Sequence, residues 1–158
     1  MISNEILNNE LNLFNMLGNY EIEIGVITKN TKRKISFGIT NAELMYIHEN
    51  GSPLNNIPAR PVLDMTIKYT NNSLLNDAIN NCINGILYSN WKQMEIETEL
   101  KKLCIRMENY ARSIIYSNDG RLAPNSPKVA AKKKGNHPLF DTGQLARSIT
   151  CRLVNKSL

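Results

Sequence analysis

Residues 90–114 read NWKQMEIETELKKLCIRMENYARSI, and this stretch decides the fold. Its apolar residues recur at spacings of four and three: Ile96, Leu100, Leu103, Met107, Tyr110 and Ile114. Such a period puts them on one face of a helix, so the stretch predicts one long helix. Asn90, followed three residues later by Gln93, predicts a capping box at its start. The apolar face fits either the protein's own core or a neighbouring subunit, and we favour its own core.

A second helical region precedes the long helix. An apolar helical pattern covers residues 62–87. The polar residues 71–73 predict a break inside it, and residues 89–90 predict another break before the long helix. Residues 52–61 read SPLNNIPARP, and the three prolines predict an extended or turning connector. Pro61 suits the first turn of the helix that follows.

The N-terminal part predicts a helix and a hairpin. Ser3 is a plausible N-cap for a helix that ends at about residue 17, before a glycine and an asparagine. Residues 20–26 and 35–39 then alternate apolar and polar side chains around a polar turn, which predicts two paired strands. Asn41 is placed to cap a short helix before the proline-rich connector.

The C-terminal part predicts one more strand. Asp141 and Gln144 have the spacing of a second capping box around a short turn. Ile149, Cys151 and Leu153 then alternate with polar neighbours. A last strand so far along the chain is expected to return to the N-terminal hairpin. The predicted fold class is therefore α+β, with a small antiparallel sheet packed against several helices, one of them long.

Composition places the chain among ordinary folded proteins. The 158 residues suit a single domain, 1–158, with 42% hydrophobic and 21% charged residues. No apolar run is long enough to predict a membrane span, and the first residues lack the basic start of a signal peptide, so we expect a cytosolic product. Three widely spaced cysteines, Cys82, Cys104 and Cys151, favour reduced core thiols over disulfides or a metal site.

The net charge of +5 comes from an excess of cations in one segment of the chain. Residues 120–140 hold five cations and no acid, together with three prolines and two glycines, which predicts a flexible basic loop. The cations are Arg121, Lys128, Lys132, Lys133 and Lys134. They could meet nucleic-acid phosphates or an acidic partner, or they could only keep the loop soluble. Because no aromatic residue is interleaved with the lysines, specific recognition of single strands is not expected.

The sequence offers little catalytic chemistry. His48 and His137 are the two histidines, and neither has a nucleophile motif beside it. His48 is interpreted as a polar helix end. No phosphate-binding glycine loop, Cys-x-x-Cys pair, His-x-x-x-His pair or calcium loop is present in the sequence. We therefore predict a protein that is not an enzyme and needs no cofactor, metal or small-molecule substrate.

Two segments resemble a known family. Residues 46–63 read YIHENGSPLNNIPARPVL, and residues 121–149 read RLAPNSPKVAAKKKGNHPLFDTGQLARSI. In this order they resemble the signature motifs of the tail-completion and virion-morphogenesis proteins of tailed bacteriophages. The matching residues of the first segment are Glu49, Gly51, Ile57, Pro58, Ala59, Arg60, Pro61 and Leu63. Those of the second are Leu122, Pro124, Pro138, Leu139, Asp141, Thr142, Gly143, Leu145, Ser148 and Ile149.

The resemblance implies a structural virion protein, made in the host cytoplasm, that completes the tail and connects it to the head. In that family the protein works as a ring, commonly hexameric, without a catalytic centre or a membrane. Its expected partners are copies of itself and neighbouring neck or tail proteins, with the basic loop reaching an acidic surface or packaged DNA. Val62, where the family commonly has a bulky aromatic residue, and the amide-rich residues 71–90 depart from the pattern. The alternative is a small phage-encoded nucleic-acid-binding protein that uses the basic loop.

Overall fold

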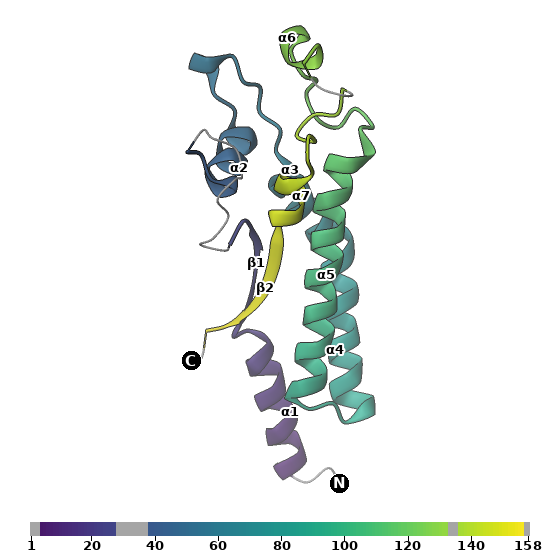
Figure 1. The fold of residues 1–158 in the computed structure, drawn as a ribbon. Coiled ribbons are helices and arrows are strands. Elements are labelled where there is room, and N and C mark those ends of the chain that lie inside the picture. The colour runs from purple at the N-terminus through teal and green to yellow at the C-terminus, as the bar shows by residue number, and fades with distance from the viewer. Residues whose placement is uncertain (1–3, 28–37, 133–135, 157–158) are drawn as a thin grey trace.

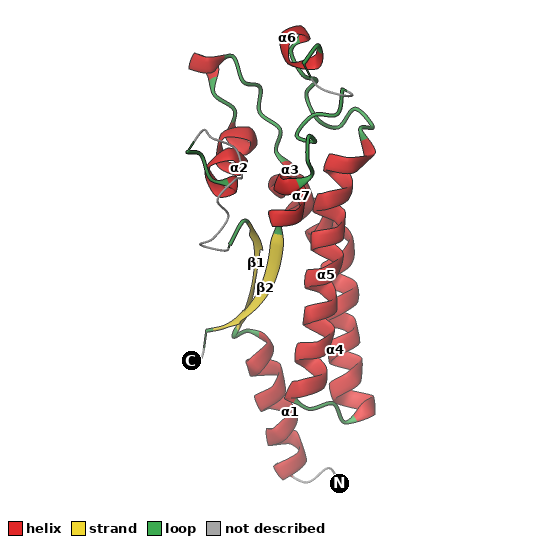
Figure 2. Ribbon diagram, in the orientation of Figure 1, coloured by secondary structure: helices red, strands yellow, loops and turns green. Residues whose placement is uncertain are grey.

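The computed structural model describes residues 4–27, 38–132 and 136–156. It has the predicted α+β class, and Figure 2 shows helices beside one narrow sheet. The helices are α1 (Asn4–Leu17), α2 (Asn41–Asn50), α3 (Val62–Tyr69), α4 (Leu75–Ser89), α5 (Gln93–Ser117), α6 (Pro127–Ala130) and α7 (Gln144–Ser148). The strands are β1 (Tyr20–Gly25) and β2 (Thr150–Asn155), and two short turns, η1 (Pro53–Asn55) and η2 (Thr70–Leu74), complete the order.

The long helix predicted from the apolar period is α5, which lies along the molecule beside α4 and the sheet (Figure 1). Five of the six stripe residues are buried, and the sixth, Tyr110, is half-buried. The buried ones are Ile96, Leu100, Leu103, Met107 and Ile114. Because α5 packs against α3, α4 and β2, the stripe faces the protein's own core, as expected.

The break predicted at residues 71–73 is wrong. Helices α3 and α4 are joined through η2, a single π-helical turn, so the helix continues from Val62 to Ser89. The polar side chains at 71–73 point to solvent, while buried Thr70 donates its hydroxyl to the Thr66 carbonyl at 2.8 Å. A wider turn absorbs one extra residue, and packing on both sides of it outweighs the low helix propensity of asparagine and serine.

The turn between α4 and α5 lies where it was predicted, but the capping box does not. Asn90 has a left-handed backbone, with φ of 51°, and terminates α4. The N-cap of α5 is Lys92, whose backbone N–H donates to the Glu95 carboxylate at 2.9 Å. The predicted pairing of Asn90 with Gln93 is therefore wrong, because asparagine serves the end of one helix instead of the start of the next.

The two strands of the described sheet come from opposite ends of the chain. β1 and β2 pair antiparallel, from Tyr20 opposite Asn155 to Gly25 opposite Thr150. This confirms that the C-terminal strand returns to the N-terminal one. An ion pair between Glu23 and Arg152, at 2.7 Å, links the strands across the exposed face. Most of the second hairpin strand, predicted at 35–39, lies outside the described residues, and Ile39 itself is in no strand.

The two N-terminal helices follow the predicted order. Helix α1 ends at Leu17 as expected, whereas its predicted cap, Ser3, lies outside the described residues. Helix α2 is capped by Thr40, one residue before the predicted Asn41. The Thr40 hydroxyl accepts the Glu43 N–H at 3.2 Å, and the Glu43 carboxylate accepts the Thr40 N–H at 2.7 Å. This reciprocal pair fixes the start of α2.

Candidate functional site

The two segments that carry the family resemblance meet at Arg60. This side chain is 5% exposed. Its Nε donates to the Ala123 carbonyl at 2.7 Å, and its Nη2 donates to the Pro124 carbonyl at 2.8 Å. Its Nη1 lies 3.3 Å from Nδ1 of His48. We call this contact the Arg60 clasp, because it holds two segments together that are about sixty residues apart in the sequence.

The first segment forms a closed turn. Ser52 and Ile57 exchange backbone hydrogen bonds of 2.8 and 3.0 Å, so residues 53–56 project as a small loop. Leu54, at its tip, is 97% exposed. Beyond the turn, the Arg60 N–H donates to the His48 carbonyl at 2.6 Å, which returns the chain alongside the end of α2.

Glu49 caps helix α3 from outside. Its carboxylate oxygens accept the backbone N–H groups of Leu63 at 3.0 Å and Asp64 at 2.7 Å. These donors lie in the first turn of α3, where backbone N–H groups have no partner inside the helix. A negative charge there also complements the positive end of the helix dipole. Glu49, the first matching residue of the family resemblance, is therefore a helix cap in this fold.

Gly51 is required by the closed turn, which gives the first prediction. Its φ is +74°, and a Cβ at this position would lie 2.8 Å from the backbone N of Ala59. We expect Gly51→Ala to lower the free energy of unfolding by about 2 kcal/mol or more, measured by urea denaturation. Gly120→Ala is the matched control, because Gly120 also has positive φ, +88°, but a Cβ added there would meet nothing within 4 Å. It should lose only about 1 kcal/mol, and equal losses would contradict the proposed clash.

The second segment forms α7 and leads into β2. Leu145, Ala146 and Ile149 are buried, and α7 packs against α2 and α5. Asp141 does not cap α7, so the predicted box with Gln144 is wrong. The N-cap is Gly143, with φ of +73°, because the chain enters the helix through a left-handed residue. The exposed Thr142 supplies its carbonyl to Arg147 Nη2 at 2.9 Å, and Ser148 donates its hydroxyl to the Leu145 carbonyl at 2.7 Å.

The predicted basic loop is anchored at both of its ends. Leu122 and Pro138 are buried, and residues 127–130 form the short helix α6 instead of continuous loop (Figure 1). The described part of residues 120–140 is therefore not one continuous exposed loop. Burial of Leu122 and Pro138, together with the Arg60 hydrogen bonds to the Ala123 and Pro124 carbonyls, holds the segment on the body of the protein.

The candidate cations of this loop differ in their surroundings. Arg121 is engaged locally, since its guanidinium pairs with Asp119 at 2.6 Å and lies over the Tyr110 ring at 5.7 Å. The same guanidinium holds the pKa of the Asp119 carboxyl well below its usual range. Lys128 and Lys132 are exposed near the tip of the segment, whereas Lys133 and Lys134 lie outside the described residues. The structure thus leaves two of the described candidates projecting to solvent.

A cavity of about 380 Å³ lies between the two segments. Its wall includes His48, Pro58 and Arg60 from the first segment, and Asn125, Asp141 and Leu145 from the second. The guanidinium of Arg60 in this wall already donates hydrogen bonds to two carbonyls. In the described part of the chain no group of three histidine, cysteine or acidic side chains could hold a metal ion.

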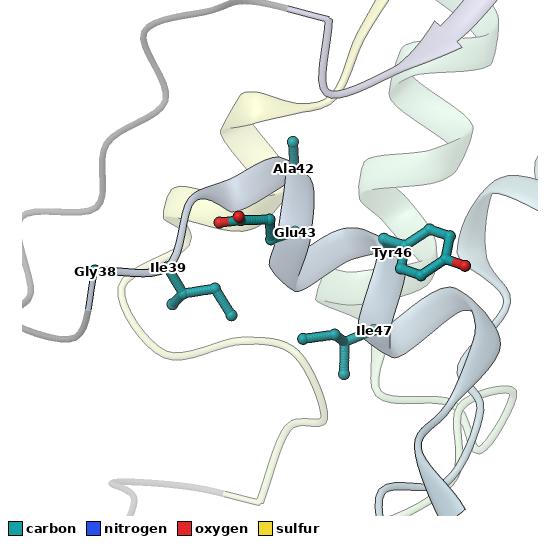
Figure 3. Close-up of a pocket in the computed structure, with 6 residues that line it drawn as sticks. All are labelled: Gly38, Ile39, Ala42, Glu43, Tyr46 and Ile47. Atoms are coloured by element: carbon teal, nitrogen blue, oxygen red, sulfur yellow. The ribbon is translucent and has the colours of Figure 1, made fainter.

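A second hollow, of about 610 Å³, lies on the outer side of α2, and the sequence did not lead us to predict it (Figure 3). It is lined by Gly38, Ile39, Ala42, Glu43, Tyr46 and Ile47. Figure 3 shows Ile39 and Ile47 pointing toward the same space, whereas the Tyr46 ring extends from α2 in the other direction. Tyr46 is 72% exposed. The spacing of Ala42, Tyr46 and Ile47 within α2 is the signal that could have revealed an apolar helix face.

Over the described residues, no helix combines the length and apolar character of a membrane span. Comparisons with protein-family models, with curated proteins and with solved structures found no match to this chain.

Proposed function

We propose that this chain is a structural protein of a tailed-phage virion, which completes the tail and connects it to the head as a ring of identical subunits. It acts by binding and not by catalysis. The observation that supports this best is the Arg60 clasp. The residues that resemble the phage family occur as two separate segments, and in the fold they form one unit with its own buried arginine.

The roles of the individual motif residues agree with the proposal that the protein is structural. Glu49 caps a helix, Gly51 permits a tight turn, and Leu145 and Ile149 are buried. Each of these structural roles explains why that residue type is needed at its position, and none of them requires the residue to take part in a reaction. A scaffold with such fixed connections suits a protein that must present a rigid contact surface to its neighbours.

Lys128 and Lys132 are the residues on which the test depends. Both are exposed on or next to α6, at one end of the molecule (Figure 1). We propose that this end contacts an acidic face of an adjacent subunit or neck protein. Charged groups across such an interface guide association, and reversing their sign places like charges together.

The double variant Lys128→Glu, Lys132→Glu should therefore prevent joining of heads and tails. We expect the infectious titre of phage carrying it to fall about a hundred-fold or more, since like-charge contacts cost several kcal/mol. Electron microscopy of the lysate should show separate heads and tails. The control is Lys68→Glu, Lys101→Glu, which makes the same change in charge on exposed helix faces. A normal titre and joined particles for the Lys128, Lys132 variant would contradict the proposal.

Binding to nucleic acid is the competing outcome of the same surface. Fluorescence anisotropy with a labelled DNA duplex at near-physiological salt separates the two possibilities. The proposal expects no saturable binding at micromolar protein. Tight binding that is lost in the Lys128, Lys132 double variant would instead favour a nucleic-acid-binding protein.

A further inference from the structure

One face of α5 meets the start of β2 at three successive turns. Residues 104, 108 and 112 are spaced by four and so lie in a row. Arg112 Nη2 donates to the Ile149 carbonyl at 2.8 Å, and Glu108 Oε1 accepts the Cys151 N–H at 2.7 Å. Cys104 is the next residue in this row, one turn before the glutamate that holds Cys151.

The two cysteines of this contact differ in their exposure to solvent. Cys104 is buried, and Cys151 is half-buried among residues of the cluster around Leu103 and Met107. Both thiols are free. Cys82, the remaining cysteine, is fully buried in a different cluster with Ile86, Ile96 and Leu100. Two of the three cysteines are thus paired in space, although the sequence separates them by 47 positions.

We propose that Cys104 and Cys151 are an oxidation site that forms an intramolecular disulfide between α5 and β2. Cys151 packs with Leu103 and Met107 of α5, and its N–H is held by Glu108, one turn from Cys104. Two thiols placed this way need little backbone movement to be joined. The bond would attach the C-terminal strand to the long helix. The proposal does not depend on the proposed virion function, because it rests only on the packing of α5 against β2.

The oxidant is a small peroxide, with hydrogen peroxide as the probe. The Cys104 thiolate attacks one peroxide oxygen, so that an S–O bond forms, the O–O bond breaks and the leaving hydroxide takes up a proton to become water. The Cys151 sulfur then attacks the sulfenic sulfur of Cys104. The S–S bond forms, the S–O bond breaks and a second water leaves. Two thiols are oxidised to one disulfide, and one peroxide is reduced to two waters.

The order of attack follows from the pKa values of the two thiols, which shift in opposite directions. Hydrogen bonding from Cys151 lowers the pKa of the Cys104 thiol, whereas the same contact and burial raise the pKa of the Cys151 thiol. Burial likewise raises the pKa of Cys82, to about 11. Because the thiolate is the nucleophile, Cys104 is the member of the pair that reacts first. Cys82 is kept out of the pair by its position, since it is fully buried in a different cluster.

The test uses the full chain, fully reduced and then treated with hydrogen peroxide. Mass spectrometry of the intact protein should show the loss of two hydrogens, and digestion without reductant should yield one peptide pair that joins Cys104 to Cys151. Cys82→Ser, the matched control, should still form this pair. A pair that involves Cys82, or a disulfide between chains as the main product, would overturn the assignment.

Two single variants separate the steps. In Cys151→Ser, the sulfenic acid of Cys104 has no thiol to meet, so dimedone should label Cys104. In Cys104→Ser, the intramolecular disulfide should be lost and labelling of Cys151 should be weak. Unlabelled Cys104 in Cys151→Ser, combined with no disulfide in the unmodified protein, would refute the proposal. The measurement on the unmodified chain remains decisive if either serine variant fails to fold.

Discussion

Replacement of Arg60 by alanine is expected to lower the free energy of unfolding by about 3 to 5 kcal/mol. The guanidinium is buried and donates to the carbonyls of Ala123 and Pro124. A hydrogen bond from a charged donor contributes about 1.5 to 3 kcal/mol, and Arg60 makes two of them. The loss of side-chain volume between the two segments adds to this cost. The clasp should therefore be among the most sensitive single positions in the chain.

Arg60→Lys tests the geometry of the clasp separately from its charge. Nε and Nη2 of arginine reach two neighbouring carbonyls at 2.7 and 2.8 Å at the same time. An ammonium group is a single point and cannot reproduce this planar fork. We expect the free energy of unfolding of Arg60→Lys to lie between that of the unmodified protein and that of Arg60→Ala.

Urea denaturation followed by circular dichroism measures both variants. Arg121→Ala is the matched control, because Arg121 lies in the same segment but forms its ion pair with Asp119 at the surface. Its loss should be about 1 kcal/mol or less. Arg60→Ala should also speed tryptic cleavage after Lys128 and Lys132, since the segment that carries them is no longer held. A loss for Arg60→Ala no larger than for Arg121→Ala would show that the clasp does not stabilise the fold.

Periodic signals in the sequence predicted the elements that carry most of the core. The apolar spacing of four and three gave α5 and its buried face, because a helix repeats regularly over 25 residues. The alternation around Cys151 gave β2, and the need to pair an isolated strand gave its return to β1. Both predictions rest on patterns that many residues share, so no single contact had to be known.

Helix ends were predicted less well, because a cap depends on one residue's backbone. Asn90 and Asp141 both fit the spacing of a capping box, yet Asn90 ends the preceding helix and Gly143 takes the place of Asp141. The π-turn at 70–74 was missed for a related reason. Low helix propensity at three residues predicts a break, but packing of the residues on either side decides whether the helix continues.

The sequence indicated which residues belong to the candidate site but not what they do. From the sequence, Arg60 was only one of the residues that match the family pattern. The fold shows that its guanidinium donates to the Ala123 and Pro124 carbonyls. Cys104 and Cys151 were interpreted as separate core thiols, because nothing in their spacing predicts that β2 lies against that face of α5. Contacts between distant segments are set by tertiary packing, and a single sequence carries no direct record of them.

Gly85 and Trp91 form the second position where a large effect is expected. Gly85 is buried in α4, and a Cβ built there would overlap the indole ring of Trp91. Trp91 closes the turn after α4 through its backbone N–H, which donates to the Gly85 carbonyl at 3.0 Å. Its ring packs on the cluster of Cys82, Ile96 and their neighbours. The glycine thus provides the space in which the ring lies.

Gly85→Ala should therefore destabilise the protein by about 2 to 4 kcal/mol, since the ring must leave its place in the core. This reverses the sign of the usual effect, because alanine in an exposed helix is favoured over glycine by about 1 kcal/mol. Trp91 is the only tryptophan, so its fluorescence reports the change directly, and its emission maximum should shift to longer wavelength in the folded variant. Asn84→Ala, at the exposed neighbouring position, should leave the emission unchanged and the stability equal or slightly higher. If Gly85→Ala is as stable as Asn84→Ala and its emission does not move, the ring does not occupy the space above Gly85.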